Sequence, residues 1–266
     1  MSASWLFIIL LAIPTAGAAA CLAARTPAAA LWTVFAGVVL HATTALSAAR
    51  RVLALGPMAS NGEWFLLDAL SAWHLIVMAL VFVPASFYAI TYFRDETASG
   101  ALSLRLARRF GALWFGALGA MTLVLISNNL GILWVGIEAT TLLTAFLICL
   151  HRSPTSLEAM WKYLIICSVG VAFAFMGTLF VAASASRTLE PGDALLWTKL
   201  LDVAGSLDRV MLEVGFIFLL VGYGTKAGLA PMHTWLPDAH SQAPAPVSAL
   251  FSGFLLNSAL YCVLRY

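Results

Sequence analysis

The sequence predicts an all-α fold, a polytopic bundle of seven or eight transmembrane helices. Hydrophobic residues make up 62% of the 266 residues and charged residues only 10%, whereas soluble domains are about half apolar and about a quarter charged. Windows of the length needed to cross a bilayer of roughly 30 Å recur along the whole chain. A late segment rich in proline and glycine also predicts an interruption near the seventh helix.

The apolar windows give eight candidate helices, at 4–24, 28–49, 69–93, 110–127, 130–150, 160–185, 210–230 and 247–264. Most charged residues lie between these windows, where helix ends meet water. The stretch before Arg25 has no basic residue ahead of its apolar core, so we expect a retained first helix and not a cleaved signal peptide. No linker is long enough to form a soluble domain.

Basic residues are weakly biased toward one side of the membrane. If every window crosses, one side carries Arg25, Arg94, Arg105, Arg108, Arg109 and Arg152, and the other carries Arg50, Arg51, Arg187, Lys199 and Arg209. The excess of positive charge favours a cytoplasmic location for the first group, which places the N-terminus outside.

The segment between the last two windows, residues 231–246, contains four prolines. They are Pro231, Pro237, Pro244 and Pro246. Proline removes a backbone donor and clashes with the preceding turn, so a regular helix cannot pass through this segment. Pattern alone slightly favours an extramembrane loop. The alternative is a broken helix inside the membrane, of the kind from which transporters build ion sites.

Three ionisable residues lie within apolar windows, and their cost in lipid makes them functional candidates. Glu138 is near the middle of its window with no basic residue within a turn. A carboxyl at this depth can hold and release a proton. Its alternative is a protonated side chain hydrogen-bonded to a neighbouring helix.

The other two are lysines. Lys226 lies one turn before the proline-rich segment, where its amine can face unwound backbone, or can extend to the membrane surface. Lys162 begins its window with Glu158 four residues earlier, an order that favours an ion pair along the helix. Its aromatic neighbours Trp161 and Tyr163 are typical of a membrane interface.

The remaining polar residues carry weaker signals. His233 and His240 flank Asp238 in the proline-rich segment, a spacing that could serve a proton relay or nothing. His41 and His74 are lone histidines on apolar helices, typical of hydrogen-bonded packing, and Glu213 is typical of a helix end. The cysteines, which we interpret as small packing residues, are Cys21, Cys149, Cys167 and Cys262.

Several function classes are disfavoured. The formal net charge of +2 is small and the basic residues are scattered, which argues against nucleic-acid binding. The sequence has no phosphate-binding glycine loop, nucleophile elbow or zinc motif, and no cysteine set for haem or an iron–sulfur cluster. We therefore expect no cofactor and no metal in this chain. A buried acid, buried lysines and an interrupted helix suit ion or proton movement better than covalent catalysis.

Three segments resemble the antiporter-like proton-translocating subunits of respiratory complex I, the Mrp antiporters and the energy-converting membrane hydrogenases. The most specific is TKAGLAPMHTWLPDAHSQAPAPVSAL at 225–250. NLGILWVGIEATTL at 129–142 is similar to the family's fifth-helix motif, and EAMWKY at 158–163 to the start of its sixth helix. Together with WKYLIICSVG at 161–170, the wording is most similar to the hydrogenase-4 component F type.

The resemblance implies roles for the buried charges. Glu138 matches the family's fifth-helix glutamate and Lys226 its seventh-helix lysine, which are proposed to exchange a proton, while Lys162 matches a sixth-helix basic position. It also implies that the seventh helix is broken at about 228–246. Residues 1–109 would then hold the first three helices, and 110–266 most of a first half-channel. The family's second half is absent, so a truncated gene, a fragment and a split subunit stay open.

Three hypotheses follow from the resemblance and the residues. The first is a proton-translocating membrane subunit in a bacterial inner membrane, with other membrane subunits and a peripheral redox arm as partners. The second is a sodium/proton antiporter subunit without redox partners. The third is a structural piece that does not conduct, which unchanged pumping after Glu138→Gln would support.

Overall fold

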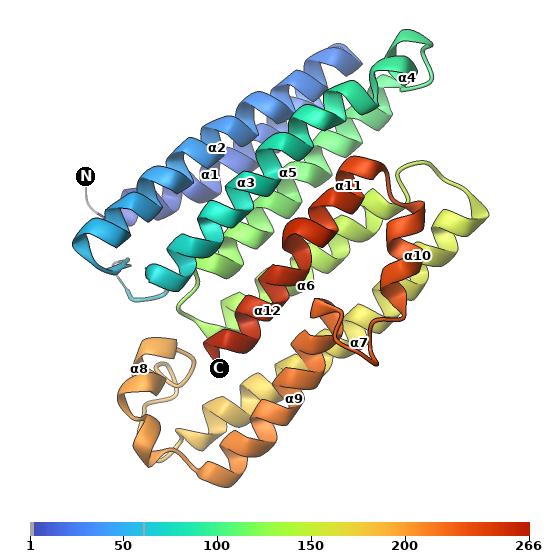
Figure 1. Ribbon diagram of the computed structural model, residues 1–266. Helices are drawn as coiled ribbons and strands as arrows, with labels where there is room; N and C mark the ends of the chain where they lie inside the picture. The colour runs from blue at the N-terminus through green and yellow to red at the C-terminus, as the bar shows by residue number, and fades with distance from the viewer. Residues whose placement is uncertain (1–2, 61) are drawn as a thin grey trace.

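The computed structural model describes residues 3–60 and 62–266, which form a helical bundle (Figure 1). Eight helical segments in this range are long and apolar enough to cross a membrane, which confirms the predicted transmembrane fold. They are α1 (Ala3–Ala23), α2 (Pro27–Leu55), α3 (Ala69–Tyr92), α5 (Leu104–Ile126), α6 (Leu130–Ile148), α7 (Pro154–Ser184), α9 (Arg209–Ala227) and a final segment that joins α11 (Ala245–Leu250), the π-helical turn η2 (Phe251–Leu255) and α12 (Leu256–Arg265).

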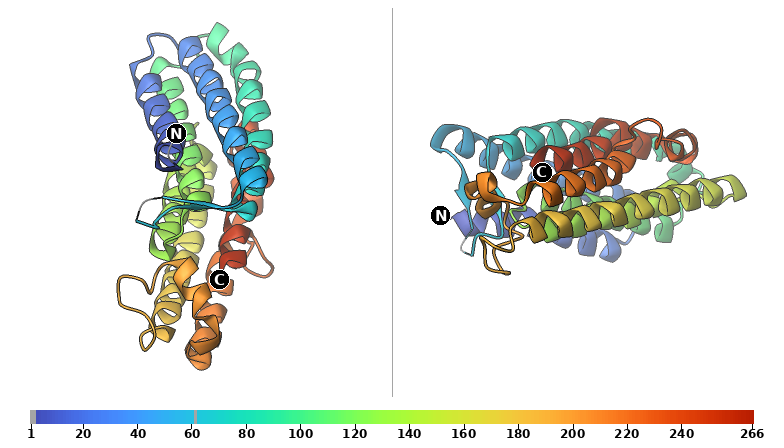
Figure 2. Two further views of the ribbon diagram at one scale, coloured as in Figure 1. Left: turned by 90° about the vertical axis from the view of Figure 1, so that its left-hand side faces the viewer. Right: turned by 90° about the horizontal axis from the view of Figure 1, so that it is seen from below.

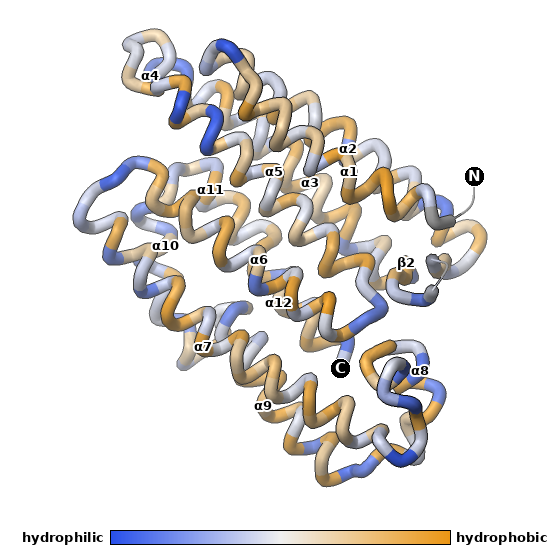
Figure 3. Tube along the Cα trace, turned by 180° about the vertical axis from the view of Figure 1, so that it is seen from behind, coloured by the Kyte–Doolittle hydropathy of each residue, from blue (hydrophilic) through white to orange (hydrophobic). Residues whose placement is uncertain are grey.

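Short elements occupy the connections between these helices. They are β1 (Met58–Ala59), β2 (Leu66–Leu67), α4 (Arg94–Ala98), α8 (Trp197–Asp202), the 3₁₀ turn η1 (Ala204–Ser206) and α10 (Trp235–Gln242). The two strands pair antiparallel, with Met58 opposite Leu67. Hydrophilic residues gather in the connections and at the helix ends, while the helix middles are hydrophobic (Figure 3). The described chain therefore has no sizeable soluble part.

Two helices begin six residues before their apolar windows. The α5 helix starts at Leu104 because the Ser103 side chain accepts a hydrogen bond from the backbone of Leu106 (3.2 Å). The α7 helix starts at Pro154, where Ser153 and Ser156 form a reciprocal capping box. Hydropathy marks the part of a helix that lies in lipid, whereas capping residues set where the helix begins.

The first helices form one side of the bundle. Figures 1 and 2 show α1, α2, α3 and α5 side by side. The Phe115 ring of α5 lies in space left by Gly17 of α1 and Gly37 of α2. An added Cβ would come within 2.6 Å of the ring at Gly17 and within 2.5 Å at Gly37. Small residues thus permit the close helix contacts that membrane proteins rely on. The division into 1–109 and 110–266 stays a prediction.

The α7 and α9 helices form the most extensive helix pair. Glycines line the contact on both sides. A Cβ at Gly177 of α7 would lie 2.7 Å from the backbone oxygen of Gly215, and one at Gly222 of α9 would lie 2.6 Å from that of Gly170. The two backbones can approach closely only because no side chain separates them. This contact fixes the end of α9 against α7.

The proline-rich segment is a helix break that contains a short helix. The α9 helix ends at Ala227 and is capped by Gly228, whose φ of 76° suits glycine. The following α10 helix lies against α7, and its Trp235 is fully buried, with Nε1 donating to the backbone oxygen of Thr225 (3.0 Å). A buried tryptophan bonded back to α9 does not fit the plain extramembrane loop that pattern alone favours. The broken-helix prediction is confirmed.

The four prolines mark the boundaries within this break. Pro231 lies in the turn after α9, and Pro237 occupies the first turn of α10. Pro244 caps α11, and Pro246 lies in its first turn. Proline is tolerated in a first turn because the amide groups there have no partner within the helix.

Candidate functional site

Lys226 lies in the last turn of α9 and is completely buried. Its Nζ donates hydrogen bonds to Thr141 Oγ1 of α6 (2.9 Å) and to the Tyr163 hydroxyl of α7. Nζ also lies 4.7 Å from the centroid of the Tyr163 ring. Within the described residues Lys226 takes part in no ion pair. The amine is therefore held inside the bundle by neutral hydroxyls and does not extend to the membrane surface.

Tyr163 connects Lys226 to a row of threonines on α6. Its hydroxyl lies 2.7 Å from Thr144 Oγ1, which also donates to the backbone oxygen of Thr140 (2.6 Å). The side chains of Tyr163, Thr140 and Thr144 are all buried. A hydroxyl can both donate and accept a hydrogen bond, so this row offers proton positions that lead away from Lys226.

Glu138 lies on α6, three residues before Thr141. Ser168 of α7 donates to its Oε1 (3.0 Å). Its Oε2 is buried and has no hydrogen-bond partner among the described residues. Glu138 and Lys226 form no direct ion pair. The two are related through one helix face, because Thr141 lies one turn from Glu138 and contacts the amine of Lys226.

Lys162 is separate from this buried cluster. Its side chain is 47% exposed and forms ion pairs with Glu158 (2.8 Å) and Asp238 (3.0 Å). The pair with Glu158 runs along α7, as the sequence predicts. The pair with Asp238 joins α7 to α10 and so helps to hold the short helix of the break in place.

The candidate relay is not assembled by direct contacts. Asp238 pairs with Lys162, His240 Nδ1 lies 2.6 Å from Ser248 Oγ, and His233 is exposed. No hydrogen bond among the described residues joins any two of the three relay residues. A relay through them would need intervening groups.

The residues of this site lie in the part of the chain that is similar to a known family. The family model described as "NADH:quinone oxidoreductase/Mrp antiporter, TM" matches residues 127–266, more than half of the chain. The chain belongs to this family. The matched range holds α6, α7, α9 and the helix break, and thus Glu138, Lys162 and Lys226.

Sequence relatives within this antiporter-like family include subunits of hydrogenase complexes. The chain is 42% identical to "Hydrogenase-4 component F homolog" of Methylacidiphilum infernorum, over 77% of this chain and 43% of that protein. It is 28% identical to "Hydrogenase-4 component B" of Escherichia coli, over 75% of this chain and 27% of that protein. These matches confirm the resemblance, and they span less than half of each relative.

Solved structures share the fold of this family member. A chain of the archaeal membrane-bound sulfane sulfur reductase superposes with a TM-score of 0.79 at 20% identity, covering 97% of this chain and 52% of that one. A chain of the Mrp complex from Dietzia sp. gives 0.80 at 18%, covering 99% and 48%. Respiratory complex I from Thermus thermophilus gives 0.75 at 22%, covering 96% and 52%.

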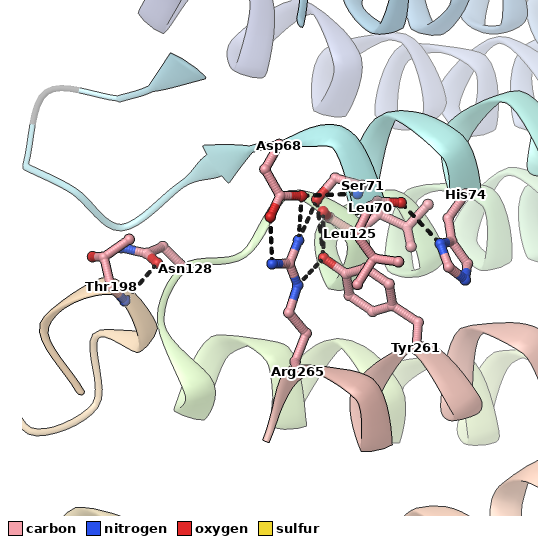
Figure 4. Close-up of polar contacts among 9 residues, drawn as sticks. All are labelled: Asp68, Leu70, Ser71, His74, Leu125, Asn128, Thr198, Tyr261 and Arg265. Carbon is pink, nitrogen blue, oxygen red and sulfur yellow. Dashed lines mark hydrogen bonds and ion pairs between the residues drawn. The ribbon is translucent and has the colours of Figure 1, made fainter. Parts of the chain in front are cut away.

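Sequence reasoning missed a second polar cluster, at the C-terminal end of α12 (Figure 4). Arg265, the last residue of α12, is only 4% exposed. Its Nη1 and Nη2 donate to the two carboxylate oxygens of Asp68, each at 2.6 Å. Nη2 also donates to Ser71 Oγ (2.7 Å), and Nε to the Tyr261 hydroxyl (2.8 Å). The cluster joins the end of α12 to the start of α3.

Asp68 lies just outside α3 and caps it, because Oδ1 accepts from the Ser71 backbone (2.9 Å). Burial alone would raise the pKa of this carboxyl, but hydrogen bonds from Arg265 and Ser71, together with the Arg265 charge, outweigh burial and lower the pKa. The available sequence signal was an arginine at the end of an apolar window and an acid at the start of another. Nothing in their spacing relates residues 197 positions apart.

The lone histidines and the cysteines have ordinary surroundings. His41 Nε2 lies 3.1 Å from Thr122 Oγ1, and His74 Nδ1 lies 2.9 Å from the backbone oxygen of Leu70. The four cysteines are buried and free. Within the described ranges no group of three or more His, Cys, Asp or Glu side chains could hold a metal ion.

Proposed function

We propose that this chain provides a half-channel for protons in a redox-driven membrane complex of the complex I or membrane-hydrogenase type. The observation that carries the proposal is Lys226, a fully buried amine that is bonded to hydroxyls. Among the residues that the structure describes, it has no counter-ion, and the second oxygen of the nearby Glu138 has no hydrogen-bond partner. Buried ionisable residues in membranes commonly lie on ion or proton pathways.

The geometry supports coupling between the two charged groups. An ammonium group inside the bundle is costly without a nearby negative charge. A charge on Glu138 therefore favours a proton on Lys226, and neutralising Glu138 favours its release. Tyr163 and the threonines offer hydroxyls that can pass the proton on. Lys162, exposed beside α10, is proposed as the point where the path meets the surface.

The partners and the location are part of the same proposal. The relatives named above are hydrogenase components, and the fold is found in multi-subunit membrane complexes. We place this chain beside other membrane subunits in a bacterial inner membrane, and the electron-transfer centres in a peripheral arm. This chain spans less than half of its relatives' length, so a complete proton path is not assigned to this chain alone.

A sodium/proton antiporter subunit without redox partners is the second candidate. Two observations favour it: the family model includes Mrp antiporters, and the Mrp complex chain has the same fold. The two candidates differ in driving force. Proton uptake driven by a redox substrate supports the first, and sodium-driven exchange that needs no redox substrate supports the second.

The test is proton uptake into sealed inverted vesicles that contain the parent complex. We expect Lys226→Ala to abolish redox-driven uptake while the complex still assembles. The matched control is Lys199→Ala, because Lys199 lies in α8 and its ion pair with Glu63 is partly exposed. Glu138→Gln should also abolish uptake. Full uptake in both the Lys226 and Glu138 variants would refute the proposal and support a purely structural role.

A further inference from the structure

A cavity of about 430 Å³ lies where α5 begins and α6 ends. It is lined by Ser103, Arg105, Leu106, Arg109, Leu150 and Arg152. Three of the six lining residues are arginines and none is acidic. This volume is large enough for a phosphate group.

The three arginines have no acidic partner within the described chain. Arg105 and Arg109 lie four residues apart on α5, on one face, and Arg152 approaches from the connection to α7. Like charges so placed repel one another. Arg108 differs, because its guanidinium donates twice to the backbone oxygen of Ala24 (2.9 and 2.6 Å).

Most acids at this end of the bundle are engaged elsewhere. Glu96 pairs with His151 (3.0 Å), and both Glu158 and Asp238 pair with Lys162. Asp95 of α4 forms no ion pair among the described residues, and neither it nor the other three acids line the cavity. The repulsion among the three arginines is therefore left for an external anion to relieve.

The cavity borders an apolar stripe on α6. Phe146 is 44% exposed and lies under Arg109, whose guanidinium carbon is 5.6 Å from the ring centroid. Leu142 and Val135, exposed at 49% and 51%, continue the stripe along this span. A cationic cavity at the end of two spans, with an apolar track leading inward, matches a lipid in shape and polarity better than a peptide.

We infer that this cavity binds the phosphate group of an anionic membrane phospholipid. Arg105, Arg109 and Arg152 would contact the phosphate oxygens, for which the guanidinium fork is well suited. One acyl chain would lie along the stripe that ends at Val135. The site is independent of Lys226, which lies buried between α6, α7 and α9.

The test is native mass spectrometry of the full chain in a neutral detergent. Phosphatidylglycerol is titrated against phosphatidylcholine with the same acyl chains, and a third arm adds inorganic phosphate. We expect at least a tenfold preference for phosphatidylglycerol, unaffected by millimolar phosphate. Equal retention of both lipids would overturn the inference and leave the cavity to an acidic segment of a partner protein. Displacement of the lipid by phosphate would overturn it in favour of a free-anion site.

Matched variants assign the preference to the cavity. The triple change Arg105→Gln, Arg109→Gln and Arg152→Gln should remove the preference, and lysine at the same three positions should retain most of it. The control removes the same charge at the opposite end, through Arg50→Gln, Arg51→Gln and Arg187→Gln, and should leave the preference unchanged. Loss of preference in the control, or its retention in the cavity glutamine variant, would refute the assignment.

Discussion

The ion pair between Asp68 and Arg265 offers a sharp test of how the end of α12 is fixed to the start of α3. Replacing Asp68 by Asn preserves the shape of the side chain and an oxygen that can cap α3. The change removes the negative charge that faces a guanidinium only 4% exposed. The effect of Asp68→Asn therefore reports mainly on the charge pair, and little on the cap.

The expected magnitude follows from the burial of the two partners. Removing one member of a buried ion pair costs about 3–5 kcal/mol. The Asp68 side chain is 19% exposed, and Asn can still accept one of the two guanidinium hydrogen bonds, so we expect the lower end, about 3 kcal/mol. The double change Asp68→Leu with Arg265→Met should cost less than Asp68→Asn, because it leaves no buried charge without a partner.

The assay is equilibrium unfolding in mixed micelles, with the free energy of unfolding measured for each variant. Arg209→Gln is the control, because its pair with Glu213 is exposed, at 88% and 61%, and should contribute nothing measurable. If Asp68→Asn unfolds with the same free energy as the control, the buried pair does not stabilise the contact between α3 and α12. A double variant less stable than Asp68→Asn would refute the reasoning about the unpaired charge.

Further predictions concern the site, the helix contact and pH. Tyr163→Phe removes one hydrogen bond to Lys226 and should slow redox-driven proton uptake by about ten- to a hundredfold, since a hydrogen bond to a charged group is worth roughly 1.5–3 kcal/mol; an unchanged rate would exclude the Tyr163 hydroxyl from the path. Gly222→Leu should separate α7 from α9 and lower stability by at least about 1–3 kcal/mol, measured against Gly205→Ala, where a Cβ meets nothing within 4 Å. The lowered pKa of Asp68 means that its contribution to stability is fully present above its unfolded pKa of about 3.9 and is lost as pH falls through the folded pKa. Acid titration of the unfolding free energy should show this loss in the unmodified chain and not in Asp68→Asn.

Hydropathy and proline predicted most of the fold, because lipid imposes a single rule on long apolar windows. The windows located all eight helical segments, and the motif resemblance resolved the choice between a loop and a broken helix. The starts of α5 and α7 were misplaced by six residues, since Ser103 and Ser153 cap these helices outside the apolar stretch. Hydrophobicity carries no information about such caps.

The sequence predicted only those site residues whose burial in a membrane costs free energy because they are charged. Glu138 and Lys226 stand out as charges in apolar windows. Tyr163 does not, because a tyrosine near the start of a window is typical of a membrane interface, and only the packing of α7 against α6 and α9 buries its hydroxyl beside Lys226. The partner of Arg265 was equally hidden, since contact between α12 and α3 depends on how the bundle closes.

The contacts of α9, α10 and α12 indicate which part of the broken helix lies next to the charge of Lys226. The end of α12 is fixed to α3 by the buried ion pair of Arg265 and Asp68. The α9 helix is fixed to α7 by the close contact between their glycines. Between these contacts, α10 is held to α7 by the half-exposed pair of Lys162 and Asp238, and to α9 by the buried Trp235, which donates to the backbone of Thr225. A change in the charge of Lys226 acts directly on Tyr163. The centroid of the Tyr163 ring lies 4.9 Å from that of the Trp235 ring in α10. Because Tyr163 contacts both Lys226 and Trp235, a charge change at Lys226 bears directly on the buried contact that holds the short helix.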